Sequence, residues 1–317
     1  MVKPAVLLLT NELDVGSDLV VRVLRERQVA FLRINTERMS ERSFSWIGGQ
    51  FSVKTPRGVM QLDDVRAVWL RQPVWPTFEG TIAEAEVLQN QWRAAVRGLA
   101  ALGASWMNPV DAGLAAESKI LQLATAARVG LDVPATCVSN DLDLVRSFAD
   151  AHQGRVVVKA IDAPLIDDGT TSRFVFTSRL DLAMLAGRDN LESVPMIFQE
   201  EIADKRDVRV LVVDGEAFAF AIDADPGEVD WRRIGREAVI THIAAPPDVI
   251  SNCQSFLAAL GLRYGAFDFA VNADRYAFLE CNQNGEWGWL QRATGAPVAG
   301  TIASALTRMP QIAVGRP

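Results

Sequence analysis

Two oxygen-bearing side chains alternate within an apolar segment near the C-terminus, where they could bind a metal ion. Residues 276–282 have the pattern of a strand, and Glu280 and Asn282 lie two positions apart in it. Side chains two apart on a strand project from the same face, whereas Leu279 and Cys281 are expected to point the other way. Mg²⁺ prefers carboxylate and carbonyl oxygens, with phosphates and water completing its shell.

A second carboxylate, Asp268, lies in the preceding apolar segment, residues 264–270. The turn is expected at residues 272–274, and a loop with an odd number of residues places Asp268 on the same face as Glu280. An ordinary hairpin with a solvated polar face is the alternative, but the flanks are too apolar for an exposed edge. We therefore predict that Asp268, Glu280 and Asn282 bind a metal ion.

Two cationic side chains occupy strand-like segments that are otherwise apolar. Lys159 lies in the valine-rich segment 155–160, and a buried lysine is costly unless it meets an anion. A lysine that reaches solvent from a sheet edge is an equal alternative. In residues 207–213, strict alternation puts Asp207, Arg209 and Leu211 on one face. Arg209 suits bidentate contact with phosphate or carboxylate, although a plain surface ion pair also fits the pattern.

Composition excludes several classes of protein. The chain has 317 residues, 49% of them hydrophobic, which is enough for two or three lobes with their own cores. A net charge of −7 and a pI of about 5.1 argue against a general nucleic-acid binder. The apolar run 6–9 is too short to span a membrane, so we expect a strand there and a cytoplasmic protein with no membrane partner.

The histidines and cysteines do not suggest catalytic or zinc chemistry. His152 is expected to face solvent and His242 to have a structural role. Cys137, Cys253 and Cys281 are dispersed without metal-ligand spacing, so they are expected to be reduced and mostly buried.

The remaining pattern predicts three blocks of secondary structure. The first has strands at 5–10, 29–34 and 67–71, helices at 17–28 and 81–102, and a hairpin joining 49–54 to 59–62. The second has helices at 115–130 and 142–152, the latter capped by Asn140, with strands at 135–139, 155–160 and 174–177 and a polar loop at 162–173. The third has strands at 196–202, 207–213, 216–222 and 238–243, a polar insert at 223–236, and a helix at 247–260 before the metal hairpin.

Familiar nucleotide-binding motifs are missing from the sequence. No Gly-Lys-Ser/Thr motif occurs, and the segment after the first strand has a single glycine, Gly16, in place of a dinucleotide fingerprint. What remains is an ordered series of two lysines, an acidic strand end, an arginine on a neighbouring strand and a late hairpin of oxygen ligands.

This series resembles the ATP-grasp superfamily of carboxylate ligases over nearly the whole chain. Within it, the pattern is similar to the graspetide (microviridin-type) peptide macrocyclases, which are related to the ligases that add glutamate to a ribosomal protein. The residues that carry the resemblance are Trp69-Leu-Arg71, Trp106-Met-Asn-Pro109, Ala116-Glu-Ser-Lys119 with Gln122-Leu123, Val133-Pro-Ala-Thr136, Val157-Val-Lys159, Gln199-Glu-Glu-Ile202, Asp207-Val-Arg209, Val229-Asp-Trp-Arg-Arg233, and Phe278-Leu-Glu-Cys-Asn282 with Asn284-Gly285 and Trp287.

The resemblance implies an α/β ATP-grasp fold with three parts. These are an N-terminal parallel-sheet pre-ATP-grasp domain (1–112), a central lobe (113–195), and a C-terminal antiparallel-sheet lobe with the metal site (196–317). It also implies roles for individual residues. The ATP phosphates would be held by Lys119 and Lys159, and the ribose would be contacted by Asp207. The hinge that reads adenine would consist of Gln199, Glu200, Glu201 and Ile202. Mg²⁺ would be bound by Asp268, Glu280 and Asn282, while Arg209 would steady the acyl phosphate or the substrate carboxylate.

The implied activity is ATP-dependent joining of side chains within a ribosomally made precursor peptide of leader and core. An Asp or Glu side chain is phosphorylated and then joined to Thr, Ser or Lys as an ester or amide, with ADP released. The resemblance also suggests a homodimer. Two alternatives stay open: an intermolecular ligase that adds an amino acid or amine to a carboxylate, and a catalytically silent ATP-binding or peptide-binding protein.

Two departures from the family pattern affect these expectations. Gln283 stands where the family usually has proline, which predicts altered loop stiffness without loss of the metal ligands. The loop 161–172 is acidic, with Asp162, Asp167 and Asp168 and only Gly169, where the family is commonly rich in glycine and serine.

Overall fold

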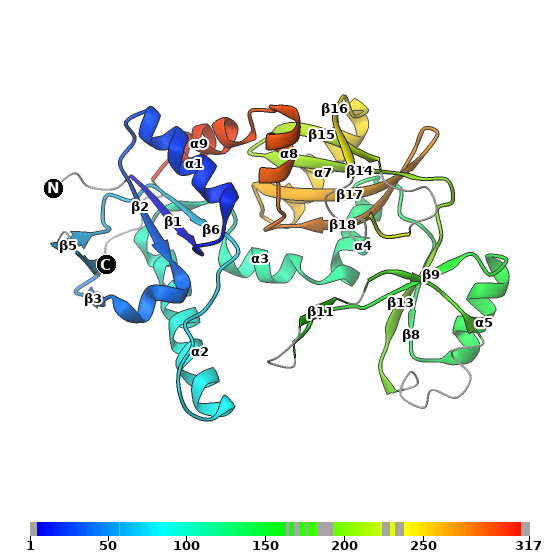
Figure 1. Cartoon of the computed structure of the whole chain (residues 1–317), viewed down its shortest axis with the longest axis horizontal. Helices are drawn as coiled ribbons and strands as arrows, with labels where there is room; N and C mark the ends of the chain where they lie inside the picture. The colour runs from blue at the N-terminus through cyan, green and yellow to red at the C-terminus, as the bar shows by residue number, and fades with distance from the viewer. Residues whose placement is uncertain are drawn as a thin grey trace.

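The computed structural model consists of three parts that follow one another along the chain (Figure 1). It describes residues 5–56, 58–162, 165–167, 172–174, 176–182, 193–223, 229–231 and 238–311, with the backbone alone for 165–167 and 172–174. The N-terminal part lies at one end of the molecule. The central and C-terminal parts lie together at the other end.

The N-terminal part is built on the predicted β-α-β opening. Its parallel sheet has the order β2-β1-β6-β7, from β1 (Val6–Thr10), β2 (Phe31–Asn35), β6 (Ala67–Leu70) and β7 (Ser105–Trp106), with α1 (Val15–Glu26) connecting β1 to β2. A short 3₁₀ helix, η1 (Thr36–Glu41), follows β2. All five residues of β1 are buried, as expected for a strand covered on both faces.

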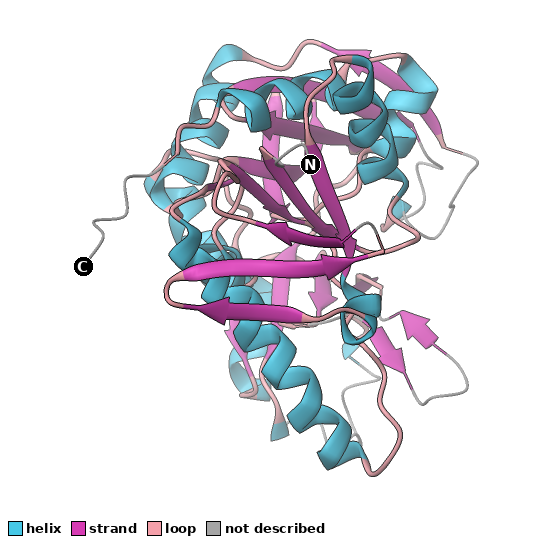
Figure 2. Ribbon diagram, turned by 90° about the vertical axis from the view of Figure 1, so that its left-hand side faces the viewer, coloured by secondary structure: helices cyan, strands magenta, loops and turns pink. Residues whose placement is uncertain are grey.

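A small antiparallel sheet and a long helix complete the N-terminal part. The sheet consists of β3 (Phe44–Ile47), β4 (Gln50–Thr55) and β5 (Gly58–Gln61), which includes the predicted hairpin. Helix α2 (Ile82–Gly98) begins with a capping box between Thr81 and Glu84 and continues into η2 (Leu99–Leu102). In both views α2 extends downward, away from the sheets (Figure 1, Figure 2).

The central part differs from the prediction in its helices. The helix predicted at 115–130 is two helices, α3 (Val110–Ala116) and α4 (Lys119–Arg128). The break occurs at Ser118, whose hydroxyl accepts a hydrogen bond from Leu121 N at 3.4 Å and so begins α4. Asp141, not Asn140, caps α5 (Leu142–Ala151), because its carboxylate reaches two amides of the first turn.

The central sheet has the order β12-β9-β13-β8. It contains β8 (Thr136–Ser139), β9 (Val156–Lys159), β12 (Ser178–Arg179) and β13 (Met196–Glu200). Strand β13 is an inner strand of this sheet, whereas the sequence predicts it as the first strand of the third block, at 196–202. The predicted loop 162–173 includes a short hairpin of β10 (Leu165–Asp167) and β11 (Ser172–Phe174), while Asp168 and Gly169 lie outside the described residues.

The C-terminal part is a five-stranded antiparallel sheet in the order β16-β15-β14-β17-β18. Its strands are β14 (Arg206–Val213), β15 (Glu216–Asp223), β16 (Val239–Ile243), β17 (Tyr264–Asn272) and β18 (Arg275–Asn282). Three helices accompany it: α7 (Pro247–Ala259), α8 (Gly288–Thr294) and α9 (Val298–Arg308). Most of the predicted insert, including Arg232 and Arg233, lies outside the described residues.

Strand β14 divides its side chains between two cores, as its alternation predicts. Val208, Val210 and Val212 pack in a core beneath α7 and α4. Leu211 and Val213 pack in a second core, which also contains residues of β1, α1 and α9. The N-terminal and C-terminal parts therefore share one core, and the face of β14 that carries Leu211 also carries Arg209, for which the sequence predicts a functional role.

The histidines and cysteines lie where they can do little chemistry. His152 is half-buried rather than solvent-facing, and its ring packs on Phe148 with 4.3 Å between the centroids. His242 stacks on Phe220 at 5.3 Å. All three cysteines are free thiols, and burial raises the pKa of the Cys281 thiol well above its usual value. Among the described residues, no helix has both the length and the apolar character needed to cross a membrane.

Candidate functional site

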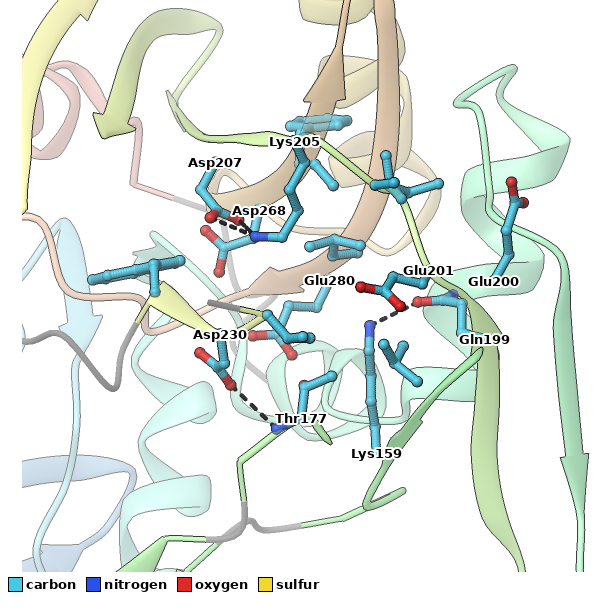
Figure 3. A pocket seen from close by; sticks show the side chains of 18 of the residues that line it. Lys159, Thr177, Gln199, Glu200, Glu201, Lys205, Asp207, Asp230, Asp268 and Glu280 are labelled. Carbon is cyan, nitrogen blue, oxygen red and sulfur yellow. Dashed lines mark hydrogen bonds and ion pairs between the residues drawn. The ribbon is translucent and has the colours of Figure 1, made fainter. Parts of the chain in front are cut away.

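Two adjoining cavities contain all of the residues for which the sequence predicted a role. The first cavity lies between the central and C-terminal sheets (Figure 3). It is lined by Lys159, Gln199, Glu200, Glu201, Ile202, Asp207, Asp268 and Glu280. The second cavity lies beside the first and is lined by Lys119, Arg209, Glu280 and Asn282. Glu280 and Trp231 line both cavities, so the two spaces meet at these side chains.

The predicted metal ligands are brought together by an irregularity in β18. Asp268 pairs with Glu280 across β17 and β18. The turn is only two residues long, since Asn272 pairs with Arg275, so the expected odd loop is wrong. A β-bulge supplies the missing register shift, because pairing moves by one residue between Phe269 and Asp268.

The bulge also changes the direction of a neighbouring side chain. Leu279 is the extra residue, and it lines the first cavity together with Glu280 instead of pointing away from it. Cys281 is buried in the core on the other side of the sheet, as predicted. Asn282 keeps its amide beside Glu280, with Asn282 Nδ2 donating to Glu280 Oε1 at 3.2 Å. The three oxygen ligands thus form one group at the junction of the cavities.

Arg209 makes a bidentate ion pair with the predicted ligand Asp268. Its Nε and Nη2 donate to the two carboxylate oxygens at 2.8 Å each, and Nη1 donates to Glu286 O at 3.1 Å. Burial alone would lower the pKa of the Arg209 guanidinium, but the charge and hydrogen bonds of Asp268, together with other nearby groups such as Glu280, outweigh it, so the pKa is raised. Arg209 is therefore a fixed positive charge beside the predicted metal ligands.

Two tryptophans flank the Arg209 guanidinium. Its Cζ lies 5.6 Å from the ring of Trp231 and 5.8 Å from that of Trp289. The two rings are 5.4 Å apart. Trp231 was part of a sequence motif, but the sequence assigned it no role, because an aromatic residue in a polar insert has no periodicity to place it.

Lys159 points into the first cavity from the end of β9. Its Nζ donates to Gln199 Oε1 at 2.7 Å, and Gln199 Nε2 in turn donates to Thr136 Oγ1 at 2.9 Å (Figure 3). The lysine is half-buried and held by a polar partner. Lys159 belongs to an inner strand of its sheet, so the sheet-edge alternative is wrong, and its binding of an anion stays a prediction.

The acidic residues of the predicted hinge have their carboxylates occupied by arginines. Glu200 accepts from Arg275 Nη1 at 2.9 Å, and this hydrogen bond lowers the pKa of Glu200. Glu201 pairs with Arg179 at 2.8 Å. Both carboxylates are therefore paired within the protein, which agrees with a predicted hinge that works largely through main-chain groups.

Asp207 faces the first cavity in a strongly charged setting. Burial raises the pKa of Asp207, and Lys205 opposes this effect from 2.5 Å. Asp230 accepts from Thr177 N at 3.2 Å and joins the C-terminal insert to the central part (Figure 3). The sequence analysis did not single out Lys205 and gave Asp230 no role beyond its place in a motif, because isolated charges in turns and inserts carry no positional signal.

The donor set fits a magnesium ion better than a transition metal. No group of three or more His, Cys, Asp or Glu side chains suited to a metal occurs in the described part of the chain. Two carboxylates and one amide are instead what a Mg²⁺ ion needs when phosphates and water supply its other ligands.

The fold has near-complete counterparts among solved structures. A RiPP-associated ATP-grasp ligase from Chryseobacterium gregarium, solved with ADP and a leader and core peptide, has a TM-score of 0.88 and 26% identity over 98% of this chain and 100% of its own. The macrocyclase MdnC from Microcystis aeruginosa, bound to the precursor peptide MdnA, has a TM-score of 0.85 and 27% identity over 95% and 99%. The macrocyclase MdnB from the same organism has a TM-score of 0.80 and 29% identity over 96% and 99%.

Comparison by sequence gives no corresponding match. No family model and no curated protein sequence matches this chain. The three-dimensional likeness nevertheless confirms the fold class predicted from the sequence, because it covers both chains almost completely.

Proposed function

We propose that this chain, an ADP-forming ATP-grasp ligase, joins side chains within a ribosomally made precursor peptide. It phosphorylates an Asp or Glu side chain and connects it to a Thr, Ser or Lys side chain as an ester or amide. The observation that carries the proposal is that two cavities meet at Glu280. The first is lined by Lys159 and the predicted hinge, and the second is lined by Arg209. The proposal is also supported by the similarity of this chain, over nearly its full length, to a ligase and a macrocyclase whose structures were solved with bound peptides.

The first cavity takes ATP in this proposal. The main chain from Gln199 to Ile202 reads adenine, and Lys159 contacts phosphate after releasing Gln199. Lys119 lines the second cavity beside Glu280, at the first residue of α4. It approaches the terminal phosphates from that side, where the helix N-terminus adds favourable partial charge.

Asp268, Glu280 and Asn282 would hold Mg²⁺, which would neutralise part of the negative charge of the nucleotide phosphates. Arg209 orients Asp268 through its two hydrogen bonds and leaves its positive charge at the side where the peptide carboxylate enters.

The reaction needs activation because a carboxylate has no acceptable leaving group. Attack of the carboxylate oxygen on the γ-phosphorus forms an acyl phosphate and releases ADP. A hydroxyl or amine of the peptide then attacks the acyl carbon, forms the ester or amide, loses a proton and expels phosphate. Positioning and charge stabilisation provide most of the rate enhancement, so no protein nucleophile is required.

The peptide substrate is expected to have a core with repeated Thr and Asp or Glu, preceded by a leader. Incubating the enzyme with ATP, Mg²⁺ and such a peptide from a neighbouring reading frame tests the proposal. Each bond formed lowers the peptide mass by about 18 Da, one water per condensation driven by phosphoryl transfer. A mass gain would favour an intermolecular ligase. Tight nucleotide binding without ADP release would favour a silent protein.

A further inference from the structure

The loop after Asn282 is fixed in place by side chains from several other elements. Residues 283–286 connect β18 to the start of α8, and each of their four backbone carbonyls accepts a hydrogen bond from a side chain. The donors are Asn108 to Gln283 O at 2.9 Å, Gln72 to Asn284 O at 3.1 Å, Tyr264 and Arg71 to Gly285 O at 2.7 and 3.1 Å, and Arg209 to Glu286 O at 3.1 Å. A loop of this length normally leaves such groups to water.

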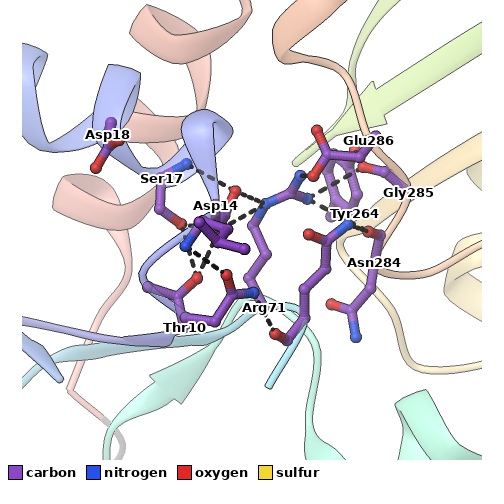
Figure 4. Close-up of polar contacts among 12 residues, drawn as sticks. Thr10, Asp14, Ser17, Asp18, Arg71, Tyr264, Asn284, Gly285 and Glu286 are labelled. Carbon is purple, nitrogen blue, oxygen red and sulfur yellow. Dashed lines mark hydrogen bonds and ion pairs between the residues drawn. The ribbon is translucent and has the colours of Figure 1, made fainter. Parts of the chain in front are cut away.

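Arg71, directly after β6 in the N-terminal part, is one of the two completely buried donors, the other being Tyr264. The guanidinium of Arg71 lies between Asp14 and Glu286 (Figure 4). Its Nε donates to Asp14 at 3.2 Å and its Nη2 to Glu286 Oε1 at 2.7 Å. The guanidinium also lies near the rings of Trp69 and Trp287, at 5.5 and 5.9 Å. One side chain therefore joins the first helix of the chain to the loop beside the metal ligands.

The loop packs tightly against the sheet at Gly285. A Cβ added at Gly285 would lie 2.4 Å from the Cβ of Ala266 on β17, so the loop is pressed against the sheet. The amide of Gly285 also donates to Asn282 O at 3.1 Å. A shift of the 283–286 loop is thus transmitted to the backbone of Asn282 at one end and to Arg209 at the other.

We propose that Arg71 and Gln72 are positioning residues for catalysis, which hold the 283–286 loop so that Asn282 and Arg209 are correctly placed. The N-terminal part then contributes directly to the geometry of the metal site. This inference rests on the proposed function, because it assigns Asn282 to Mg²⁺ and Arg209 to the reacting carboxylate.

Conservative substitutions separate this role from simple stabilisation. Arg71→Lys keeps a positive charge between Asp14 and Glu286, but an ammonium cannot reproduce the forked guanidinium that reaches two carboxylates and a carbonyl. Gln72→Asn keeps the amide but is one methylene too short to reach Asn284 O. Gln72 has a φ of 44°, and asparagine adopts this left-handed conformation readily, so the variant should fold.

The readout is ADP affinity by calorimetry, once with Mg²⁺ and once with EDTA. For the wild type we expect tighter binding with Mg²⁺. For both variants we expect the gain in ADP affinity from Mg²⁺ to fall about tenfold, the effect typical of losing a residue that orients a metal ligand. Their ADP affinity in EDTA should stay within about twofold of the wild-type value. Thermal unfolding shows that each variant is folded.

Arg33→Lys is the matched control. Arg33 lies in the same N-terminal part, pairs with Asp18 and donates to the carbonyl of Asn11 at 2.7 Å, but has no contact with the 283–286 loop. It should keep the full gain from Mg²⁺.

The outcomes distinguish this inference from the proposed function. If the wild type itself fails to bind ADP with Mg²⁺, the proposed function is wrong. If the wild type gains affinity from Mg²⁺ and both variants gain equally, the positioning role is wrong while the proposed function stands. An equal loss of ADP affinity with Mg²⁺ and with EDTA would likewise show that Arg71 has only a structural role. Should Arg71→Lys fail to fold, Gln72→Asn alone decides.

Discussion

Asp268 and Glu280 face each other across β17 and β18 because β18 contains one extra residue, Leu279, between a two-residue turn and the site. Regular pairing from that turn would place Leu279 opposite Asp268 and send Glu280 to the other face of the sheet. A bulge beside a functional site is therefore the feature that makes the two carboxylates neighbours.

The first prediction concerns these ligands. Glu280→Gln keeps the shape of the side chain and removes its charge, so ADP production should fall by about 100-fold or more, as expected when a metal loses a charged ligand. The fall is measured as ADP release at saturating Mg²⁺ and ATP with the peptide present. Asp274→Asn, in the exposed turn of the same hairpin, is the control and should keep normal turnover. Unimpaired ADP release by Glu280→Gln would exclude a role in metal binding.

The second prediction uses two arginines of β14 that make similar ion pairs. Arg209→Lys loses the bidentate contact with Asp268 in a buried setting, so turnover should fall about 100-fold, the effect of removing one preorganised donor. Arg206→Lys is the matched control. Arg206 is also bidentate, to Asp223 at 2.6 and 2.7 Å, but both side chains are almost half exposed, so turnover and stability should hardly change. Equal losses in the two variants would mean that the pair is merely structural.

The third prediction concerns the lysine of the first cavity. Lys159→Met should weaken ADP binding about tenfold or more, since a charge-assisted hydrogen bond is worth roughly 1.5–3 kcal/mol. The control is Lys54→Met, on the exposed side of β4. Calorimetry in EDTA measures the contribution of the lysine to ADP affinity without that of a metal ion. An unchanged ADP affinity under these conditions would show that Lys159 does not bind the nucleotide.

Much of this arrangement could be read from local sequence, and the rest depended on contacts between distant residues. The strands and the alternation of β14 follow from side-chain periodicity, so Asp207 and Arg209 could be placed on one face. The bulge at Leu279 could not be predicted, because neither its position nor the turn length is fixed by an apolar pattern. The separation of α3 from α4 at Ser118 is consistent with local sequence, because serine is a common N-cap residue.

Sequence also could not indicate which carboxylates would meet which arginines. Glu200 was expected only as part of the hinge, and the partner of its carboxylate is Arg275, 75 residues further along the chain. Arg71 was recognised only as part of a motif. The role that we propose for it depends on contacts with Asp14 and Glu286, which lie far apart in the sequence.

The last prediction tests the buried pair of Arg71 and Asp14 through stability and pH. Both side chains are almost fully buried, with 3.1 Å between Arg71 Nε and Asp14 Oδ2. Burial alone would raise the pKa of Asp14, but Arg71 and hydrogen bonds from Ser17 and Thr10 outweigh it, so the pKa lies below its usual value. The carboxylate therefore stabilises the folded state above the unfolded pKa of about 4, and this contribution is lost as the pH falls through the lower folded value.

Asp14→Asn isolates this charge, because asparagine still caps helix α1. We expect the free energy of unfolding near pH 7 to fall by about 3 kcal/mol, since Arg71 then keeps only the half-exposed Glu286 as its carboxylate partner. Urea unfolding of both proteins between neutral pH and about pH 3 should show the difference narrowing as Asp14 of the wild type is protonated. Asp18→Asn, on the exposed side of the same helix, should change stability by less than about 1 kcal/mol. A difference that stays constant with pH would show that the ion pair is not what stabilises this junction.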